Sequence, residues 1–407
     1  MARNDMRTGF GAILAVFIAG AVGLIPAVLT ANRPESACAA QVGEPPPPRQ
    51  AAGSQESWPM FRGEKRLLGR AAGTLPDSMS LLWKFEAKDE IKSSPVIDAN
   101  LVFVGSSDAN VYAVDLDTGG QVWAYTTEGP VEATPCVVDG SVYVGSSDDS
   151  LYALDAKSGA LNWKYETEGQ ILGGANWTIS PDGQNVWILV GSYDNRLHCV
   201  NAADGNMVWT YETDSYINGS PAVGDGKVAF GGCDEMIHIV SPADGGKVGE
   251  IDCGSFIPAS PAIFGEQVYV GSYQDVFVRA DMATGKIVWK YEEAEGAFFS
   301  SPAVGDDVVV VGCRDRQVHC ISRDHGALVW KFKTLGDVDS SPVICGDKVV
   351  VGSEDGRLYT IRLSDGEQVW SYEIGQPITS SAAVAKGMVV VGCDDGRVYA
   401  FGAKKRN

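Results

Sequence analysis

Basic residues and histidines are scarce in this sequence. Its 407 residues include 32 Lys and Arg against 52 Asp and Glu, with 4 His, and the formal net charge is −20. Such an acidic surface repels phosphate backbones, which argues against nucleic-acid binding. Hydrophobic residues make up 45% of the chain, enough for a large globular core.

Several motifs that carry chemistry are also absent. The chain has 9 Cys but no CxxCH sequence for covalent haem and no CxxC pair. It contains neither an EF-hand-like calcium loop nor a GxxxxGK[ST] phosphate loop. We therefore predict no catalytic residues, no metal ligands and no bound cofactor.

A long apolar run without charge lies near the N-terminus. Gly9–Ala31 comes after Arg3 and Arg7. Its length is about the 20 residues that a membrane-spanning helix needs, and the preceding positive charge favours export of the downstream chain. Residues 1–31 are expected to be a signal peptide or a signal-anchor helix that associates with the membrane. Cleavage, retention and lipidation at Cys38 stay open, and each places the rest in the periplasm or cell envelope.

The next segment cannot form a core. Residues 32–57 are rich in Pro, Ala, Gly and polar residues, and Pro45–Pro48 favours an extended chain. We predict a disordered linker there, a docking segment over residues 58–80, and a basic tail over residues 404–407.

A tryptophan recurs about every 40 residues through the remaining sequence. The series is Trp83, Trp123, Trp163, Trp209, Trp289, Trp330 and Trp370. Gly249 stands at the midpoint of the one double gap, so the pattern has eight positions. A glycine lies 18 residues before each position from Trp123 onward. This periodicity indicates a repeated structural unit.

Each unit reads as four short strands separated by Gly- and Asp-containing turns. Leu151–Asp155 alternates with period two, and a glycine turn leads to the next strand, Ala160–Glu166. Four strands per roughly 40 residues are typical of a β-propeller, whereas a linear solenoid would need polar end caps. The last unit lacks a fourth strand, and Leu81–Lys88 can supply one. We predict an all-β, eight-bladed propeller over residues 81–403, closed by this N-terminal strand.

The third unit is longer than the others. Gly145 and Gly191 are 46 residues apart, and Pro181-Asp182-Gly183 lies between them. An extended first hairpin that turns at these three residues explains the insertion.

The polar residues that recur in each unit are interpreted as structural. Gly159 and its equivalents are expected to adopt a positive φ in the turn before the tryptophan. The hairpin aspartates, such as Asp108, are expected to accept backbone hydrogen bonds. His198, His238 and His319 stand where other units have Tyr, so they are predicted to be packed aromatics. Cys313 and Cys393 stand where other units have Ser, which suits a small buried residue.

The repeat "YALDAKSGALNW" (Tyr152–Trp163), with "SPAV" and "VYVGSSD", resembles the PQQ-like β-propeller repeat from about Trp83 to Gly402. "WPMFRGEKRLLG" (Trp58–Gly69) resembles a segment that often precedes such propellers. The resemblance implies either a quinoprotein dehydrogenase, which holds pyrroloquinoline quinone (PQQ) and calcium at the propeller axis, or a non-enzymatic scaffold of the outer-membrane assembly (BamB) type. The compact repeats and the absence of adjacent cysteines favour the scaffold.

Sequence differences between blades indicate where a partner binds. The segments that lead into the inner strands vary, and they converge at one mouth of the ring. The candidate residues there are Lys92, Glu132, Asn176, Trp177, Tyr216, Asn218, Phe256, Phe298, Phe299, Asp337 and Asp339. The aromatic side chains are interpreted either as anchors for a partner or as filling of the inner rim.

Three functions are weighed for this mouth. The favoured one is an exported, non-catalytic scaffold that binds envelope proteins and is itself monomeric. The second is a small-ligand-binding or sensory propeller, in which Lys92 and Glu132 with Asn176 and Trp177 line a polar pocket. The third is a PQQ-dependent dehydrogenase.

Overall fold

The computed structural model describes residues 56–404. The predicted N-terminal helix, nearly all of the predicted linker and the end of the basic tail lie outside these residues. Within the described range, no helix is long and apolar enough to cross a membrane.

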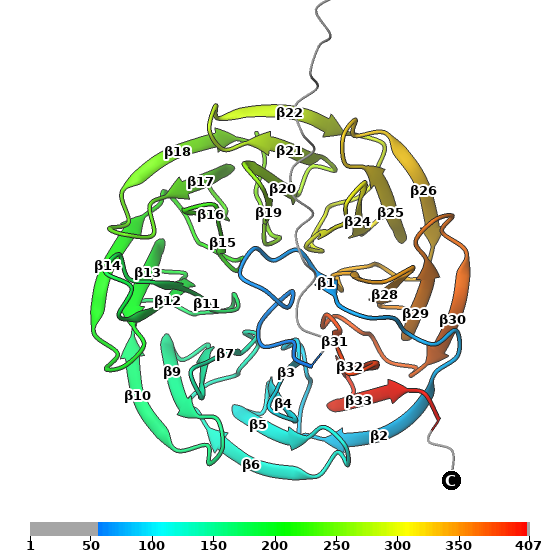
Figure 1. Cartoon of the computed structure of the whole chain (residues 1–407), viewed down its shortest axis with the longest axis horizontal. Coiled ribbons are helices and arrows are strands. Elements are labelled where there is room, and N and C mark those ends of the chain that lie inside the picture. The colour runs from blue at the N-terminus through cyan, green and yellow to red at the C-terminus, as the bar shows by residue number, and fades with distance from the viewer. Residues whose placement is uncertain (1–55, 405–407) are drawn as a thin grey trace, which may run out of the picture. The chain divides into compact units, whose positions relative to one another are not determined.

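Eight β-sheets form a ring, and this arrangement confirms the predicted eight-bladed propeller (Figure 1). Seven sheets have four antiparallel strands, and the sheet of blade 7 has a fifth. Blades 1 to 7 run outward in sequence order, from a short inner strand to an outer strand at the rim, and blade 8 takes its outer strand from the chain before blade 1.

The strand bounds repeat closely from blade to blade. The innermost strands of blades 1 to 8 are β3 (Val96–Asp98), β7 (Cys136–Val138), β11 (Asn176–Ile179), β15 (Ala222–Gly224), β19 (Ala262–Phe264), β23 (Ala303–Val304), β27 (Val343–Cys345) and β31 (Ala383–Ala385). The second strands are β4 (Leu101–Gly105), β8 (Ser141–Gly145), β12 (Val186–Gly191), β16 (Lys227–Gly231), β20 (Gln267–Gly271), β24 (Val308–Cys313), β28 (Lys348–Gly352) and β32 (Met388–Cys393). The third strands are β5 (Asn110–Asp115), β9 (Ser150–Asp155), β13 (Arg196–Asn201), β17 (Met236–Val240), β21 (Phe277–Asp281), β25 (Gln317–Ser322), β29 (Arg357–Arg362) and β33 (Arg397–Gly402). The outer strands are β6 (Gln121–Thr126), β10 (Leu161–Glu166), β14 (Met207–Glu212), β18 (Lys247–Asp252), β22 (Lys286–Tyr291), β26 (Leu328–Lys333), β30 (Gln368–Glu373) and, in blade 8, β2 (Ser80–Glu86).

The ring closes as predicted, because β2 supplies the outer strand of blade 8. It pairs antiparallel with β33, from Ser80 opposite Gly402 to Glu86 opposite Arg397. Arg397 also donates a side-chain hydrogen bond to Glu86 at 3.1 Å. Strands from the two ends of the described chain therefore complete one sheet.

Residues 58–71, which precede β2, cross the centre of the ring (Figure 1). We call residues 58–71 the central segment. Its backbone bonds to the inner strands of blades 1, 2, 4, 5, 6 and 7 in turn, through pairs such as Trp58 with Ile97 and Gly69 with Ile344. In blade 3 the Asn176 side chain takes this role by donating to the Lys65 carbonyl at 2.7 Å. Its last residues form β1 (Arg70–Ala71), which pairs parallel with β27.

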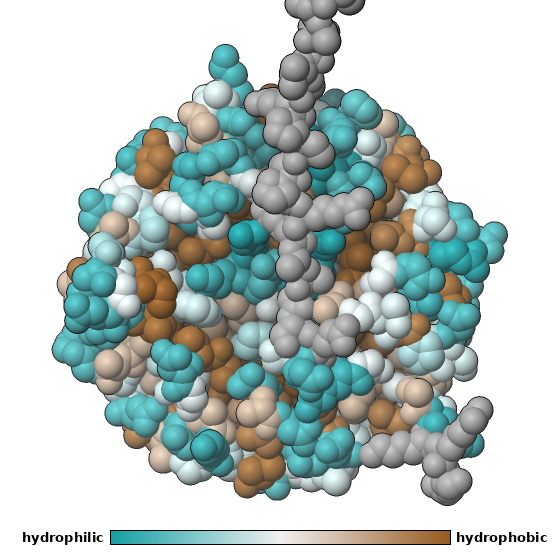
Figure 2. All heavy atoms as spheres, viewed as in Figure 1, coloured by the Kyte–Doolittle hydropathy of each residue, from teal (hydrophilic) through white to brown (hydrophobic). Residues whose placement is uncertain are grey.

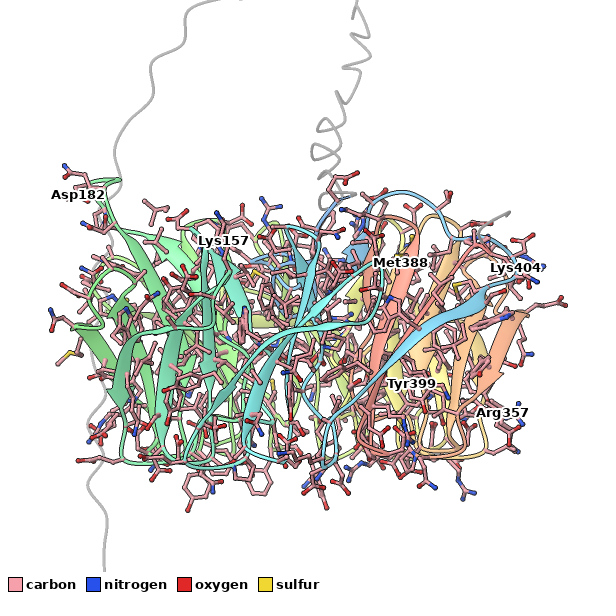
Figure 3. All side chains as sticks on the ribbon, turned by 90° about the horizontal axis from the view of Figure 1, so that it is seen from below. Lys157, Asp182, Arg357, Met388, Tyr399 and Lys404 are labelled. Atoms are coloured by element: carbon pink, nitrogen blue, oxygen red, sulfur yellow. The ribbon has the colours of Figure 1, made fainter. Side chains whose placement is uncertain are left out.

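The ring has two faces, which we name by their loops. The mouth face carries the segments that enter each inner strand and the hairpins between second and third strands. The turn face carries the turns between first and second strands and those between third and outer strands. Lys157 and Asp182 lie at the turn face and Arg357 toward the mouth face (Figure 3). Figure 2 looks onto the turn face, where apolar residues are dispersed among hydrophilic ones.

The extended first hairpin of blade 3 is confirmed. Strands β11 and β12 pair from Asn176 opposite Leu189 to Ile179 opposite Val186. The connecting loop turns at Gly183, which has a φ of 75°, and Asp182 projects from the turn face (Figure 3).

The outer-strand tryptophans pack against the next blade, as predicted. The Trp123 indole donates to the Ala156 carbonyl of the next blade at 3.0 Å. Its ring covers Gly159, which has a φ of 71° and no room for a side chain. Gly249 replaces the tryptophan in blade 4, and Gly285 of the following blade accordingly has no ring over it.

This contrast predicts different costs for two equivalent glycine substitutions. A Cβ on Gly159 would lie 2.6 Å from the Trp123 ring, whereas a Cβ on Gly285 would meet its nearest atom at 3.4 Å. Both Gly159→Ala and Gly285→Ala incur the left-handed backbone strain of about 1–2 kcal/mol. Gly159→Ala should lose roughly 1–3 kcal/mol more, because the indole must move. The free energy of unfolding in denaturant measures this difference, and equal losses would contradict the proposed tryptophan contact.

Candidate functional site

A funnel opens at the centre of the mouth face. Its volume is about 180 Å³, and Phe61 of the central segment lies at its floor. The surrounding wall comes from the segments that enter the inner strands. Those wall residues include Asn218, Pro258, Phe299, Asp339 and Thr379.

Serine hydroxyls form much of the funnel wall and link the blades. The backbone N–H of Ser220 donates to the Ser260 hydroxyl at 2.8 Å, and Ser260 donates in the same way to Ser301 at 3.0 Å. The series continues to Ser341, Ser381 and Ser94 in the next blades. These hydroxyl oxygens accept a neighbour's backbone hydrogen bond, so the wall is polar and rigid.

Arg62 attaches the central segment to the inner strands of the propeller. This side chain is 1% exposed, and its guanidinium donates to the carbonyls of Ser341, Pro302 and Pro342. Burial lowers the pKa of Arg62 to about 9, so the group stays charged at neutral pH. The three carbonyls belong to blades 6 and 7, and the contact therefore fixes the floor to the wall.

The funnel lining does not fit PQQ with calcium. That quinone carries three carboxylates, which call for cationic partners, and calcium takes about 6–8 oxygen ligands. Among the residues described, the funnel lining contains no Lys or Arg, and its one charged side chain is Asp339. The single Asp339 carboxylate supplies at most two of the oxygen ligands that calcium needs, and no cation of the lining pairs with the quinone's carboxylates.

Aromatic side chains form an exposed arc on the mouth face beside the funnel. We define the aromatic arc as Tyr193, Tyr216, Phe256, Tyr273 and Phe299. Tyr216 is 50% exposed, Phe256 48% and Tyr273 53%. Tyr193 and Tyr216 stack with ring centroids 4.9 Å apart, and Tyr273 meets Phe299 edge-on at 6.0 Å. The arc spans blades 3 to 6 and offers apolar area with little side-chain freedom left to lose.

Carboxylates occupy the other side of the mouth face. We define the acidic arc by its six members, which are Glu90, Glu132, Asp337, Asp339, Glu354 and Asp394. Partial burial and repulsion from Asp339 and Asp337 raise the pKa of Glu354. Burial raises the pKa of Asp394, and the charge of Glu90 adds to this effect. These shifts report a concentrated negative potential.

Two cations are interleaved with the acidic arc. Lys92 lies 2.9 Å from Glu90 and 3.6 Å from Glu132. Arg314 pairs with both carboxylate oxygens of Asp339, and its guanidinium lies 3.4 Å from the centre of the Phe299 ring. Arg314 therefore joins the aromatic arc to the acidic arc.

Three of the candidate residues make contacts within the propeller. Phe298 is fully buried against Phe277 and His319, so it fills the inner rim and cannot anchor a partner. Asn176 is also fully buried, because its amide binds the central segment and the Pro221 carbonyl. Trp177 lies beneath the Lys65 ammonium, 4.1 Å from the ring centre. These last two residues therefore do not join Lys92 and Glu132 in a pocket.

The other candidates lie at the mouth face. Lys92, Tyr216 and Phe256 are exposed, and Glu132, Phe299, Asp337 and Asp339 are half-buried. Asn218 is half-buried at the funnel wall, where its amide donates to the Cys233 sulfur at 3.0 Å.

Sequence reasoning missed the hairpins between second and third strands. Tyr193, Tyr273, Arg314, Glu354 and Asp394 come from these hairpins and complete both arcs. Antiparallel pairing places them on the same face as the predicted segments. That topological rule was the available signal.

The recurrent aspartates and histidines play the predicted structural roles. Asp108 accepts hydrogen bonds from the Asn110 backbone N–H and the Tyr112 hydroxyl. Burial alone would raise the pKa of Asp108, but these bonds outweigh it and the pKa is lowered. In blade 3, His198 replaces the tyrosine and bonds Asp194 at 3.0 Å.

Comparisons with known proteins agree with this architecture. The sequence profile of the family described as outer membrane protein assembly factor BamB matches residues 74–181, 174–245 and 233–406. Among curated protein sequences, none matches this chain.

Several solved structures share the fold. BamB from Moraxella catarrhalis is 20% identical over 81% of this chain and 99% of its own, with a TM-score of 0.68. The computationally designed Ika8 protein is 16% identical over 79% of this chain and 99% of its own, with a TM-score of 0.70. Quinohemoprotein alcohol dehydrogenase from Comamonas testosteroni is 13% identical over 87% of this chain and 82% of its own, with a TM-score of 0.74. At these identities the likeness concerns the fold alone.

Proposed function

Because this chain belongs to the family of outer membrane protein assembly factor BamB, we propose that it is an exported scaffold that binds a protein partner through its mouth face. The observation that carries the proposal is the exposed aromatic arc beside the acidic arc. In this proposal the chain acts as a monomer in the periplasm or cell envelope, and residues 9–31 direct its export or hold it at the membrane.

The chemistry of the two arcs defines the partner. Exposed Tyr and Phe side chains are enriched at binding hot spots, where they fill apolar pockets of the partner. The acidic arc attracts basic groups and sets the orientation of approach. A complementary partner therefore presents apolar pockets or side chains next to Lys or Arg. The role in outer-membrane protein assembly that the family description names is consistent with such a scaffold.

The central segment supports a scaffold rather than an enzyme. Phe61 lies at the funnel floor, Arg62 holds the central segment in place, and the lining offers no cation for the carboxylates of the quinone that the dehydrogenase alternative requires. A rigid, blade-linked face loses little conformational entropy on binding.

Photo-crosslinking tests this proposal. A photoreactive residue at Tyr216 or Phe256 in full-length protein should capture a discrete envelope protein in the cells that make this chain. The matched control is the same residue at Val248, which is 51% exposed but lies on outer strand β18. Tyr216→Ala and Phe256→Ala should each weaken binding of the captured protein by about tenfold or more, because aromatic anchors carry much of the binding energy. Equal capture from Val248 would contradict the assignment of the mouth face.

A second candidate function rests on the funnel. Its volume of about 180 Å³ and its hydroxyl-lined wall suit a small polar ligand. Such a ligand would bind deep in the funnel, so Ser301→Val would abolish its binding while crosslinking from Tyr216 persisted.

A further inference from the structure

Blade 6 brings together three side chains that can ligate a metal ion. Cys313 ends β24, Asp315 lies in the next hairpin and His319 lies in β25. Their ligand atoms all lie within 4.8 Å of one another. The His319 Nε2 atom is 3.0 Å from the nearer Asp315 oxygen, and Cys313 and His319 are both fully buried.

The other blades show that this combination is distinctive. At the corresponding positions, blade 1 has Ser106, Asp108 and Tyr112, and these hydroxyls complete the blade's hydrogen bonds. Blade 3 has the imidazole of His198 but the hydroxyl of Ser192, and blade 8 has the thiol of Cys393 but the phenol of Tyr399. Among the described residues, the grouping of thiol, carboxylate and imidazole within ligand distance is found in blade 6 alone.

We propose that Cys313, Asp315 and His319 bind one divalent transition-metal ion, with Zn²⁺ as the expected ion. Zinc takes thiolate, imidazole and carboxylate ligands in tetrahedral sites. One thiolate and one carboxylate neutralise the two charges of the ion, so the buried site carries no net charge. This inference goes beyond the proposed scaffold function and does not depend on it.

The surroundings of His319 are arranged for ligation. Its Nδ1 atom lies 2.8 Å from the buried Tyr291 hydroxyl. When Nε2 binds the metal, Nδ1 carries the proton and donates it to the Tyr291 oxygen, which fixes the tautomer and the ring orientation. The hydrogen bond therefore acts as the outer-shell contact that histidine ligands usually have.

The thiol exchanges one bond for another when the ion enters. In the structure the Cys313 thiol donates to the Gly296 carbonyl at 2.9 Å. On binding, the S–H bond breaks, the proton leaves to solvent and the sulfur binds the ion. The Gly296 oxygen is then free beside the ion as a fourth ligand. No electron is transferred.

Cobalt substitution tests the site with a direct spectroscopic readout. The full-length protein is stripped with a chelator and titrated with Co²⁺, then with Zn²⁺ in competition. We expect one Co²⁺ per chain with a thiolate-to-cobalt charge-transfer band, which Zn²⁺ removes. Zn²⁺ should also raise the unfolding temperature, because an ion that binds only the folded state stabilises it.

Variants taken from the chain's own repeats provide the controls. Cys313→Ser and His319→Tyr install the residues that other blades carry, so both should fold, and both should lose the band and the stabilisation by Zn²⁺. Tyr291→Phe should weaken metal affinity by roughly 10–100-fold without removing a ligand. The matched controls Cys393→Ser and His198→Tyr should bind Co²⁺ like the unaltered protein. Absence of the band, or its persistence in Cys313→Ser, would overturn the assignment and leave the trio as a hydrogen-bonded set.

Discussion

Replacing Arg62 with Ala should lower the free energy of unfolding by roughly 3–5 kcal/mol. The side chain is 1% exposed and is the shared donor for the carbonyls of Ser341, Pro302 and Pro342. Its removal leaves these buried oxygens without their donor, at about 1–3 kcal/mol each before any relaxation. Release of a buried charge offsets part of this loss, and the cavity left between the central segment and blades 6 and 7 adds to it.

Arg70 provides the control for charge alone. Arg70 pairs with Asp306 at 3.0 Å, and the Asp306 side chain is 47% exposed. Arg70→Ala should therefore cost no more than about 1 kcal/mol. Denaturant unfolding of the two variants measures the contrast. If Arg62→Ala had a free energy of unfolding equal to or above that of Arg70→Ala, Arg62 would not be the residue that attaches the central segment to the funnel wall.

Two adjacent phenylalanines should lose very different amounts of folding free energy on the same substitution. Phe298→Ala should cost about 3–5 kcal/mol of folding free energy, because the ring is fully buried against Phe277 and His319. Phe299→Ala should cost about 1 kcal/mol, since the half-buried ring mainly loses its contact with Arg314. Thermal and denaturant unfolding measure both effects.

The pair also separates stability from binding. Phe299→Ala should weaken partner capture at the mouth face while leaving the propeller folded. Phe298→Ala leaves every residue of the aromatic arc in place. Below its unfolding temperature this variant should therefore still bind the partner. If Phe298→Ala abolished partner capture while folded and Phe299→Ala had no effect, the assignment of the aromatic arc as the binding surface would be wrong.

The propeller could be predicted because each repeat carries the residues that form its contact with the next blade. Trp123 and Gly159 are 36 residues apart yet form one contact, and the same pair recurs around the ring. The strand that closes the ring was predictable for the same reason. Leu81–Lys88 has the pattern that the last blade lacks.

The site was harder to predict because it depends on which side each residue faces. Phe298 and Phe299 are neighbours in the segment that leads into β23, yet one ring is fully buried and the other is half-buried at the mouth face. Asn176 looked available because nothing in its own repeat reveals that residues 58–71 pass beside it. The cysteine, aspartate and histidine of blade 6 each fit their position in the repeat, so the repeat pattern alone gives no sign that the three meet in one blade.

The central segment also constrains how the chain reaches its native state. Residues 58–86 are synthesised before all eight blades, but Gly69 bonds to Ile344 and β2 pairs with β33, more than 270 residues later. Closing such long loops is slow, because the entropy is lost before the contacts form. Residues 58–86 can therefore make their native contacts only after the last blades have been synthesised. A chain that stops before Arg397 lacks β33 and leaves β2 without its partner strand. The outer strand of blade 8 is therefore paired only once the last strand of the propeller, β33, is available.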